Sequence, residues 1–338
     1  MSNSIQHNDF ISHTVHRHEL PVTDQAIEIV HDDNDLLVVN KPASIPVHPC
    51  GRYRHNTIIF ILAKEYGYKN LHTVHRLDRL TSGILIFTKT AHKSREMETL
   101  ISGRQVRKRY LCRVNGEFPE KLYCEQPIKV ISYKIGVCVV ADDGKPCRTE
   151  FERISYKDGV SILSCRPFTG RMHQIRVHLQ YLGFPIANDP LYNSDAFGPR
   201  RGKYGDIGKT EEELISDLIQ RHSAQHWIES SEADNDTTDA DQASLGDVAI
   251  AGRNDESVGK EGNDHENSEP CDRPDLAGEY PVTDPDTEDR KYYDEHCIDC
   301  KRSYKDPPKD TMFIYLHALQ YSGDGWEYKT SPPSWTNL

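Results

Sequence analysis

The chain has 338 residues and a formal net charge of −12, and 36% of its residues are hydrophobic, with a mean hydropathy of −0.70. This length allows two average domains or one larger domain with insertions, and the low hydropathy indicates that a long polar stretch dilutes an ordinary core. No apolar run approaches the roughly 20 residues that span a bilayer, which excludes a membrane-spanning helix, and the N-terminus lacks an apolar signal core.

Short strands and helices are predicted over the first 228 residues. Residues 26–41 predict a hairpin, and residues 57–66 predict a buried helix. The further predicted elements are a strand within 72–88, a helix at 90–102, strands at 110–114, 128–140, 149–156 and 160–165, and helices at 171–182 and 210–228. This order lacks a regular strand–helix–strand alternation, so it favours an α+β fold with a largely antiparallel sheet.

The charge is distributed unevenly along the chain. Residues 1–200 carry 27 basic and 21 acidic side chains, whereas residues 201–300 carry 9 basic and 28 acidic ones. Within the first part, residues 51–113 hold 14 basic and 4 acidic side chains, a pattern typical of a polyanion-binding module, although an ordinary solvated face is the more common explanation of charge alone.

Residues 229–290 are rich in Asp, Glu, Ser, Asn and Gly and should be disordered, because they cannot bury enough surface to offset their chain entropy. Residues 312–321 are apolar again and should rejoin the core. We therefore expect an N-terminal extension at 1–24, the main part of a catalytic domain at 25–228, an acidic insertion at 229–305, and a closing part at 306–338.

The densest group of candidate residues is the run 75–83, in which Asp78 lies between Arg76 and Arg79, ahead of a Ser-Gly turn and an apolar strand. The flanking cations should keep the Asp78 carboxylate ionised and available as a nucleophile or base. Taken alone, such a pattern more often marks an aspartate that ties down its own turn.

Two more groups follow along the chain. Arg107 and Lys108 precede Tyr110 at the start of a strand, which suits phosphate binding and base stacking, although a solvated strand start is the commoner meaning of such a stretch. Residues 169–178 predict a Thr-Gly turn that leads into a helix with two arginines and two histidines. Arg171, in its first turn, could reach an anionic centre, whereas a single histidine there is more often structural.

Several chemistries are excluded by missing patterns. The chain has no phosphate-binding loop, no dinucleotide fingerprint, no G-x-S-x-G nucleophile turn and no H-x-E motif of zinc deaminases. The nine cysteines are odd in number and scattered, as in an intracellular protein with reduced thiols. Cys297 and Cys300 form a lone C-x-x-C beside His296, and because a zinc site needs about four ligands while Cys271 is the only other cysteine nearby, we expect no metal site.

Together, and in this order, these groups resemble the RluA family of RNA pseudouridine synthases. Residues 75–83 resemble its H-R-L-D-x-x-T-S-G signature. Its other motifs are similar to residues 39–42 with 45–49, to 109–110, to 169–179 followed by 183–186 and 189–192, and to 316–318. The similarity covers roughly 25–205 and 310–330. Residues 48–52, 134–138 and 297–300 resemble a eukaryotic branch that includes fungal tRNA-modifying enzymes and usually carries more sequence before the catalytic domain, so an RNA-binding part is either lost here or lies outside a fragment.

The resemblance implies the pseudouridine synthase fold, a mixed and mostly antiparallel sheet with flanking helices and a central RNA-binding cleft. It also implies isomerisation of uridine without cofactor or metal. Asp78 would be the essential carboxylate, Tyr110 would stack on the uracil, and Arg171 would pair with Asp78 and hold it ionised. Arg76 would fill the space that the extruded base leaves. The RNA-binding side chains would be Arg76, Arg79, Arg52, Arg104, Arg107, Lys108, His173 and Arg176.

Two rival hypotheses remain at this stage. One is a catalytically idle RNA-binding protein that keeps the fold. The other is an RNA hydrolase or glycosidase that uses Asp78 with a second carboxylate nearby, although residues 79–95 contain no acidic side chain. We expect an RNA partner, tRNA before mRNA or rRNA, no membrane, no nucleotide cofactor, a monomer, and a cytoplasmic or else nuclear location.

Overall fold

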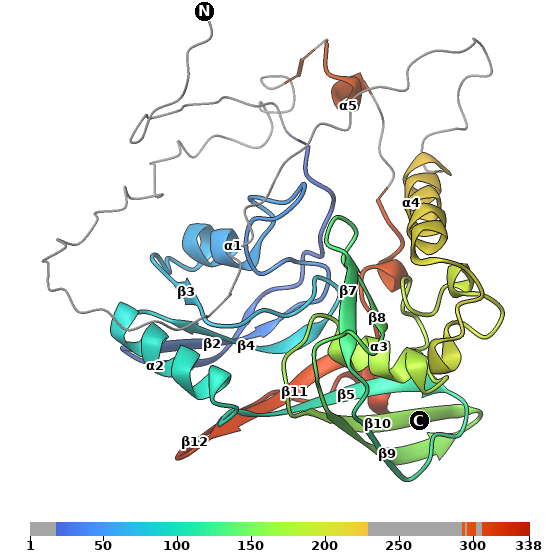
Figure 1. The fold of residues 1–338 in the computed structure, drawn as a ribbon. Coiled ribbons are helices and arrows are strands. Elements are labelled where there is room, and N and C mark those ends of the chain that lie inside the picture. Colours follow the sequence, from blue (N-terminus) through green and yellow to red (C-terminus); the bar gives the residue numbers. More distant parts are fainter. Residues whose placement is uncertain (1–17, 229–292, 295, 302–305) are drawn as a thin grey trace, which may run out of the picture. The chain divides into compact units, whose positions relative to one another are not determined.

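The computed structural model describes residues 18–228, 293–294, 296–301 and 306–338 (Figure 1). The strands are β1 Glu28–Asp32, β2 Leu36–Lys41, β3 His72–Thr73, β4 Ser82–Thr88, β5 Arg107–Asn115, β6 Lys121–Cys124, β7 Ile128–Ser132, β8 Val137–Val140, β9 Thr149–Lys157, β10 Val160–Pro167, β11 Leu316–Gly323 and β12 Trp326–Lys329. The α-helices are α1 Ile58–Glu65, α2 Ala91–Ser102, α3 Gln174–Tyr181, α4 Glu211–Ile228 and α5 Ile298–Lys301. Short 3-10 helices lie at Asp195–Phe197, Lys203–Gly205, Lys309–Thr311 and Ser334–Thr336.

One large sheet organises the described residues. Its strand order is β1-β2-β4-β11-β5-β10-β9-β6, with β12 added to β11 and β3 added to β4. β11 runs parallel to β4, and the other neighbouring pairs are antiparallel. The prediction of an α+β fold with a mixed, mostly antiparallel sheet is confirmed. β11 lies between β4 and β5, so it places C-terminal residues beside the strand that follows Asp78 and the strand that carries Tyr110.

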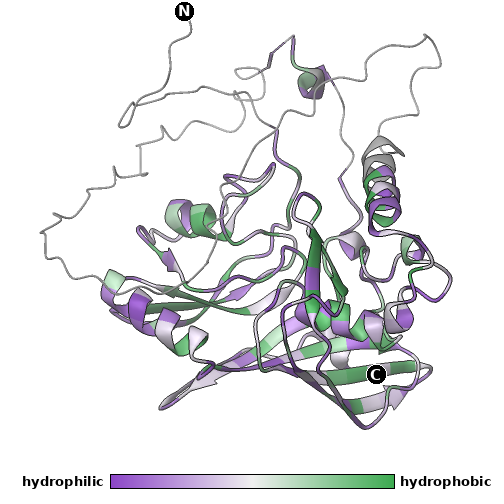
Figure 2. Cartoon of the chain, viewed as in Figure 1, coloured by the Kyte–Doolittle hydropathy of each residue, from purple (hydrophilic) through white to green (hydrophobic). Residues whose placement is uncertain are grey.

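The neighbouring strands β2 and β4 are hydrophobic without alternation, because both faces of the sheet are covered here. In β2, residues 36–39 are at most 7% exposed, and in β4, residues 84–87 are at most 1% exposed. Figure 2 shows these hydrophobic strands together with the hydrophilic residues of α2. Gly83 has φ +113°, and a Cβ there would collide with the Ala318 backbone, so only glycine lets β4 and β11 approach this closely.

Helix α3 lies between two hydrophobic clusters, which fixes its position. Ile175 and Leu179 belong to the main core over the sheet, whereas Val177 packs with Tyr192 in a smaller core that also contains the β7–β8 hairpin and α4 residues. Seven of its eight residues are buried, including Arg176. A helix held on both sides can present a buried charged side chain with little freedom to move.

Some predicted boundaries are confirmed and others are wrong. The hairpin at 26–41 is formed by β1 and β2. The single run expected at 128–140 is two strands, β7 and β8, joined by a turn. The helix expected at 171–182 begins only at Gln174, because His173 adopts a left-handed conformation with φ 55°. The predicted disordered stretch at 229–290 lies outside the described residues.

No helix in the described part of the chain is long and apolar enough to cross a membrane.

Candidate active site

The loop that carries Asp78 connects β3 to β4 and is anchored to the hydrophobic core and to β4. The Thr81 amide donates to the Asp78 carbonyl at 3.1 Å and closes a turn, and Leu77 is buried in the core. The His75 ring accepts the amide hydrogen of Ile86 through Nε2 at 3.0 Å. Because burial lowers the pKa of His75 to about 3, the ring is neutral and able to accept this hydrogen bond.

A buried lysine holds the other side of this loop. Lys41 is fully buried at the end of β2, and its Nζ donates to the carbonyl oxygens of Pro42 and Ile45 at 2.8 Å and of Arg79 at 3.1 Å. Burial lowers the pKa of Lys41 to about 7, and the nearby Asp78 carboxylate opposes that shift. Lys41 therefore ties the loop to the sheet one residue beyond Asp78.

The Asp78 carboxylate pairs with Arg176 of α3. Nη1 of Arg176 donates to Asp78 Oδ2 at 3.0 Å, while Nε and Nη2 donate to the two carboxylate oxygens of Asp189 at 2.7 and 2.9 Å. Asp189 also accepts the backbone amides of Leu191 and Tyr192. The guanidinium is thus fixed by a bidentate pair on one edge and offers its remaining edge to Asp78.

His173 is the second side chain turned toward Asp78. Its Nε2 lies 3.7 Å from Asp78 Oδ1, and its Nδ1 lies 2.8 Å from the Tyr192 hydroxyl. The Tyr192 hydroxyl accepts a hydrogen bond from the Cys138 amide at 3.1 Å, so it can donate its own hydrogen to His173 Nδ1. The neutral imidazole then carries its hydrogen on Nε2, which faces Asp78.

Electrostatics at this site favour an ionised carboxylate. Burial raises the pKa of Asp78, but His173, Arg176 and Arg76 together hold it below its usual value. Burial lowers the pKa of His173, so this ring is mostly neutral near pH 7 and the permanent charge of Arg176 remains the main partner. With a side chain 27% exposed, Asp78 is ionised and still reachable from solvent.

Tyr110 lies in β5 between β10 and β11, opposite Cys165 and Ala318. It is 9% exposed, and its hydroxyl is hydrogen-bonded to the hydroxyl of Tyr321 in β11. Burial raises the pKa of Tyr110, and the Asp78 carboxylate adds to that shift, so the phenol stays protonated beside an ionised aspartate.

The expectation that Arg171 pairs with Asp78 is wrong. Arg171 is in the turn before α3, and its Nε and Nη2 donate to the Pro146 carbonyl at 3.3 Å. The helix starts later than predicted, so Arg176 inside it, not Arg171 ahead of it, is directed to Asp78. The motif was correctly located, but the role belongs to the other arginine.

The remaining predicted RNA-binding residues lie in three places. Arg76 is exposed next to Asp78, and Arg79 stacks its guanidinium 5.7 Å above the Tyr53 ring. Arg52 is ion-paired with Asp299 at 3.1 Å. Arg104, Arg107 and Lys108 line a cleft together with residues that were not predicted to bind RNA.

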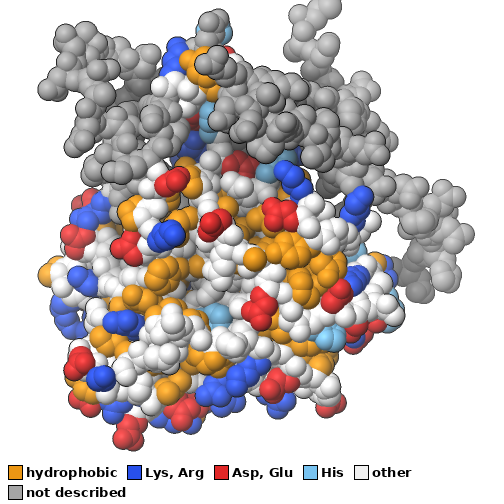
Figure 3. Space-filling model, turned by 180° about the vertical axis from the view of Figure 1, so that it is seen from behind, with side chains coloured by type: hydrophobic (Ala, Val, Ile, Leu, Met, Phe, Trp, Pro, Cys, Tyr) orange, Lys and Arg blue, Asp and Glu red, His pale blue; other side chains and the backbone are white. Residues whose placement is uncertain are grey.

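This cleft has a volume of about 550 Å³ and is strongly basic. Its lining residues are Arg104, Val106, Arg107, Lys108, Glu125, Pro146, Cys147, Arg148, Arg166, Pro167, Phe168 and Thr169. Five are cations and one is an acid, whereas on the face shown in Figure 3 side chains of both signs are interspersed. The exposed ring of Phe168 lies under the Arg148 guanidinium at 5.0 Å. Lys108 lies 5.6 Å from the Tyr321 ring, which places the cleft beside the two tyrosines.

Four site residues had no role in the sequence analysis: Lys41, Asp189, Tyr192 and Tyr321. Lys41 is a charged residue at the end of the apolar strand LLVVNK. Asp189 and Tyr192 belong to the stretch 189–192, which resembles a family motif. These sequence features could have drawn attention to the residues, but their contacts depend on how distant segments of the chain pack together.

The family of this chain follows from its similarity to known proteins. The family model described as RNA pseudouridylate synthase matches residues 35–181. RNA pseudouridine synthase 7 of Oryza sativa subsp. japonica is 36% identical over 348 residues, which cover 99% of this chain and 75% of that protein. The chain therefore belongs to the RluA-type family of RNA pseudouridine synthases, as the sequence motifs predict.

Two other relatives place it within the family. Pseudouridylate synthase RPUSD2 of Mus musculus is 45% identical over 98% of this chain, which spans 60% of the length of that relative. The mitochondrial tRNA pseudouridine(32) synthase of Saccharomyces cerevisiae is 43% identical over 240 residues, 68% of this chain and 51% of the yeast protein. The similarity supports the eukaryotic branch that the motifs indicate.

Proposed function

We propose that this protein isomerises uridine to pseudouridine in RNA, with tRNA as the substrate class. The observation that carries the proposal is the state of the Asp78 carboxylate. Arg176 keeps it ionised, its side chain is partly exposed, and it lies close enough to the buried phenol of Tyr110 to raise the pKa of that phenol. An ionised and partly exposed carboxylate is suited to covalent chemistry on a nucleotide.

The reaction needs no redox partner. The bond between the ribose C1′ and the uracil N1 breaks, the uracil turns, a bond forms between C1′ and C5, the C5 proton leaves, and N1 gains a proton. Asp78 can act by adding to C1′ or to the ring, and either route requires the unprotonated carboxylate that Arg176 maintains. The ring face of Tyr110 would stack on the uracil.

RNA binding is assigned to the cleft and to Arg76. A base inside a stacked RNA must be extruded to reach Asp78, which costs a few kcal/mol. Arg104, Arg107 and Lys108 supply charge for phosphates, and Phe168 supplies an exposed ring for an unstacked base. Arg76, exposed beside Asp78, is placed to occupy the space left in the stack.

A glycosidase or hydrolase is disfavoured by the state of the neighbouring carboxylate. Asp189, on the far side of Arg176, is 2% exposed and accepts two guanidinium and two backbone hydrogen bonds. It is therefore not available as the second acid or base that such a reaction requires.

The decisive experiment is tritium release from RNA that carries [5-³H]uridine, with the wild-type chain compared with Asp78→Asn. We expect release with the wild type and a loss to background with the variant, because the amide cannot act as a nucleophile. The matched control is Asp158→Asn, in an exposed turn between β9 and β10. Wild-type protein that binds RNA without releasing tritium would establish the idle RNA-binding alternative.

The substrate class is tested in the same assay. tRNA is favoured because the yeast relatives carry the names tRNA pseudouridine(32) synthase and tRNA pseudouridine(31) synthase. We expect faster release from bulk tRNA than from equal masses of rRNA or mRNA. Release from rRNA or mRNA alone would keep the chemistry and refute the tRNA assignment.

A further inference from the structure

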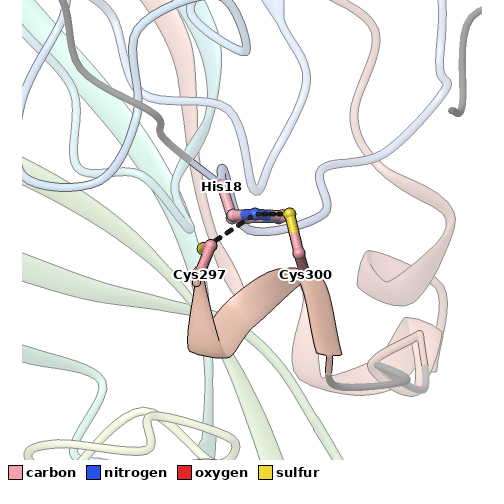
Figure 4. A group of neighbouring side chains, drawn as sticks. All are labelled: His18, Cys297 and Cys300. Carbon is pink, nitrogen blue, oxygen red and sulfur yellow. Dashed lines mark hydrogen bonds between the residues drawn. The ribbon is translucent and has the colours of Figure 1, made fainter. Parts of the chain in front are cut away.

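Three side chains from two segments that lie far apart in the sequence converge at α5. His18 belongs to the N-terminal segment, and Cys297 and Cys300 stand at the start and within the helix (Figure 4). His18 Nε2 lies 3.6 Å from Cys297 Sγ and 3.3 Å from Cys300 Sγ, and the three ligand atoms all lie within 4.8 Å of one another. The sequence alone does not reveal this group, because 279 residues separate His18 from Cys297.

The local backbone prepares the two sulfur atoms. Cys297 and Cys300 are one helical turn apart, so both point to the same side, and the Cys297 amide donates to the Asp294 carbonyl at 3.0 Å. The Asp294 amide lies 3.4 Å from Cys300 Sγ and donates to it. An amide hydrogen directed at sulfur is the kind of second contact that orients a cysteine ligand toward a metal.

We propose that His18, Cys297 and Cys300 bind a zinc ion. With Zn–S near 2.3 Å and Zn–N near 2.0 Å, a tetrahedral site separates sulfur and nitrogen ligand atoms by about 3.5 Å. The two observed separations bracket that value. Thiolate and imidazole together are the ligands that zinc prefers.

Hydrogen bonding alone accounts for this arrangement less well. A single imidazole nitrogen offers either one lone pair or one hydrogen, so it cannot serve two thiols at once. A thiol is also a weak donor and acceptor, which gives little reason for two of them to face one nitrogen atom. A cation between the three atoms satisfies all of them, with a water molecule or a further side chain at its fourth position.

The site would fasten the N-terminal segment and α5 over one loop. The Glu19 carboxylate, next to His18, accepts the amides of His55 and Asn56 at 2.7 and 2.9 Å. Asp299, between the two cysteines, is paired with Arg52 in the same loop. A metal at this position would therefore cross-link the N-terminal segment to α5, two segments that lie far apart in the sequence. It would also hold residues 52–56 between them.

The test is the zinc content of the full chain, purified under reductant and measured by inductively coupled plasma mass spectrometry. We expect about one zinc ion per wild-type chain and a fall of at least about tenfold in Cys297→Ser and in Cys300→Ser. His18→Cys should retain zinc, because a thiolate replaces the imidazole, whereas His18→Ala should lose it. Cys50→Ser is the matched control, since Cys50 is a cysteine of similar exposure outside the cluster.

A second measurement guards against variants that lose zinc by misfolding. Cobalt loaded into the wild-type chain should give thiolate-to-metal charge-transfer absorption, and zinc X-ray absorption should show two sulfur ligands near about 2.3 Å. Wild-type protein without zinc or cobalt binding would overturn the proposal, as would zinc content that is unchanged in both cysteine variants. A Cys297–Cys300 disulfide in freshly purified protein, detected by mass spectrometry, would overturn it as well.

Discussion

Asp78 and Arg176 are 98 residues apart in the chain, yet Arg176 Nη1 donates to Asp78 Oδ2 at 3.0 Å. The contact depends on α3, which two hydrophobic clusters hold from opposite sides, and on Asp189, which fixes the other edge of the guanidinium. The arginine is therefore preorganised, and it stabilises the charged carboxylate without first having to leave water.

Replacing Arg176 should damage the reaction far more than replacing Arg171. We expect Arg176→Lys to lower kcat/KM by about 100-fold, because one ammonium cannot bridge Asp78 and Asp189 as the planar guanidinium does. Arg171→Lys should change kcat/KM by less than about fivefold, since the Arg171 guanidinium donates to the Pro146 carbonyl and not to Asp78.

The lysine variants keep the charge, so comparison of their circular dichroism and thermal unfolding with the wild type shows whether the fold survives. Equal losses in the two variants, with both proteins folded, would contradict the assignment of Arg176 as the partner of Asp78. In Arg176→Lys the acid limb of the pH profile should shift to higher pH, and in Arg171→Lys it should not. Such a shift would show that the Asp78 pKa is no longer lowered by Arg176.

The hydroxyls of Tyr110 and Tyr321 should behave as one unit. Tyr110→Phe and Tyr321→Phe each leave a buried hydroxyl without its partner, which should cost about 1–3 kcal/mol in unfolding free energy. The double variant removes both groups and should cost clearly less than the sum of the single changes. Urea unfolding of the four proteins measures this coupling, and additive values would show that the two hydroxyls do not interact in solution.

The sheet, most of the elements and the loop that carries Asp78 could be predicted from the sequence, because these depend on patterns within short stretches. The H-R-L-D motif and the apolar strand after it identify the loop without any knowledge of the fold. The choice between Arg171 and Arg176 could not be made in this way. It depends on where α3 begins, and the left-handed His173 that sets this boundary has no strong local signal.

Contacts between distant segments were beyond sequence reasoning for the same physical reason. Tyr321 meets Tyr110 only because β11 inserts between β4 and β5, and His18 meets Cys300 only because both chain segments pass over the same loop. Composition and periodicity describe single elements, whereas these contacts are fixed by the topology of the sheet and by loops whose path no pattern encodes.

The basic cleft should control the salt dependence of RNA binding. Arg104→Ala and Arg107→Ala should each weaken binding and lower the slope of log affinity against log salt concentration by about 0.7, the value for one lost phosphate contact on a single strand. Fluorescence anisotropy with labelled tRNA at several salt concentrations measures the slope. Lys157→Ala, exposed at the end of β9 and outside the cleft, is the control. Equal slopes in all four proteins would place the phosphate contacts elsewhere.

The buried histidine His178 should make the folded protein less stable in mild acid. Its Nε2 donates to the Gln126 carbonyl and its Nδ1 accepts from the Thr149 hydroxyl, each at 2.9 Å, so the neutral ring satisfies both partners. Burial lowers the pKa of His178 to about 4, against about 6.5 in an unfolded chain. The unfolded state therefore binds a proton that the folded state does not, and this contribution to stability is complete above about pH 6.5 and lost as the pH falls toward 4.

Between pH 7 and pH 5 this one group should cost about 2 kcal/mol of unfolding free energy. His178→Gln removes the titration and keeps a donor and an acceptor, so its stability should fall about 2 kcal/mol less than that of the wild type over the same interval. Chemical unfolding at both pH values gives the comparison, with His72→Gln in the exposed strand β3 as the matched control. A wild type and a His178→Gln variant that lose the same stability on acidification would mean that folding does not lower the pKa of His178.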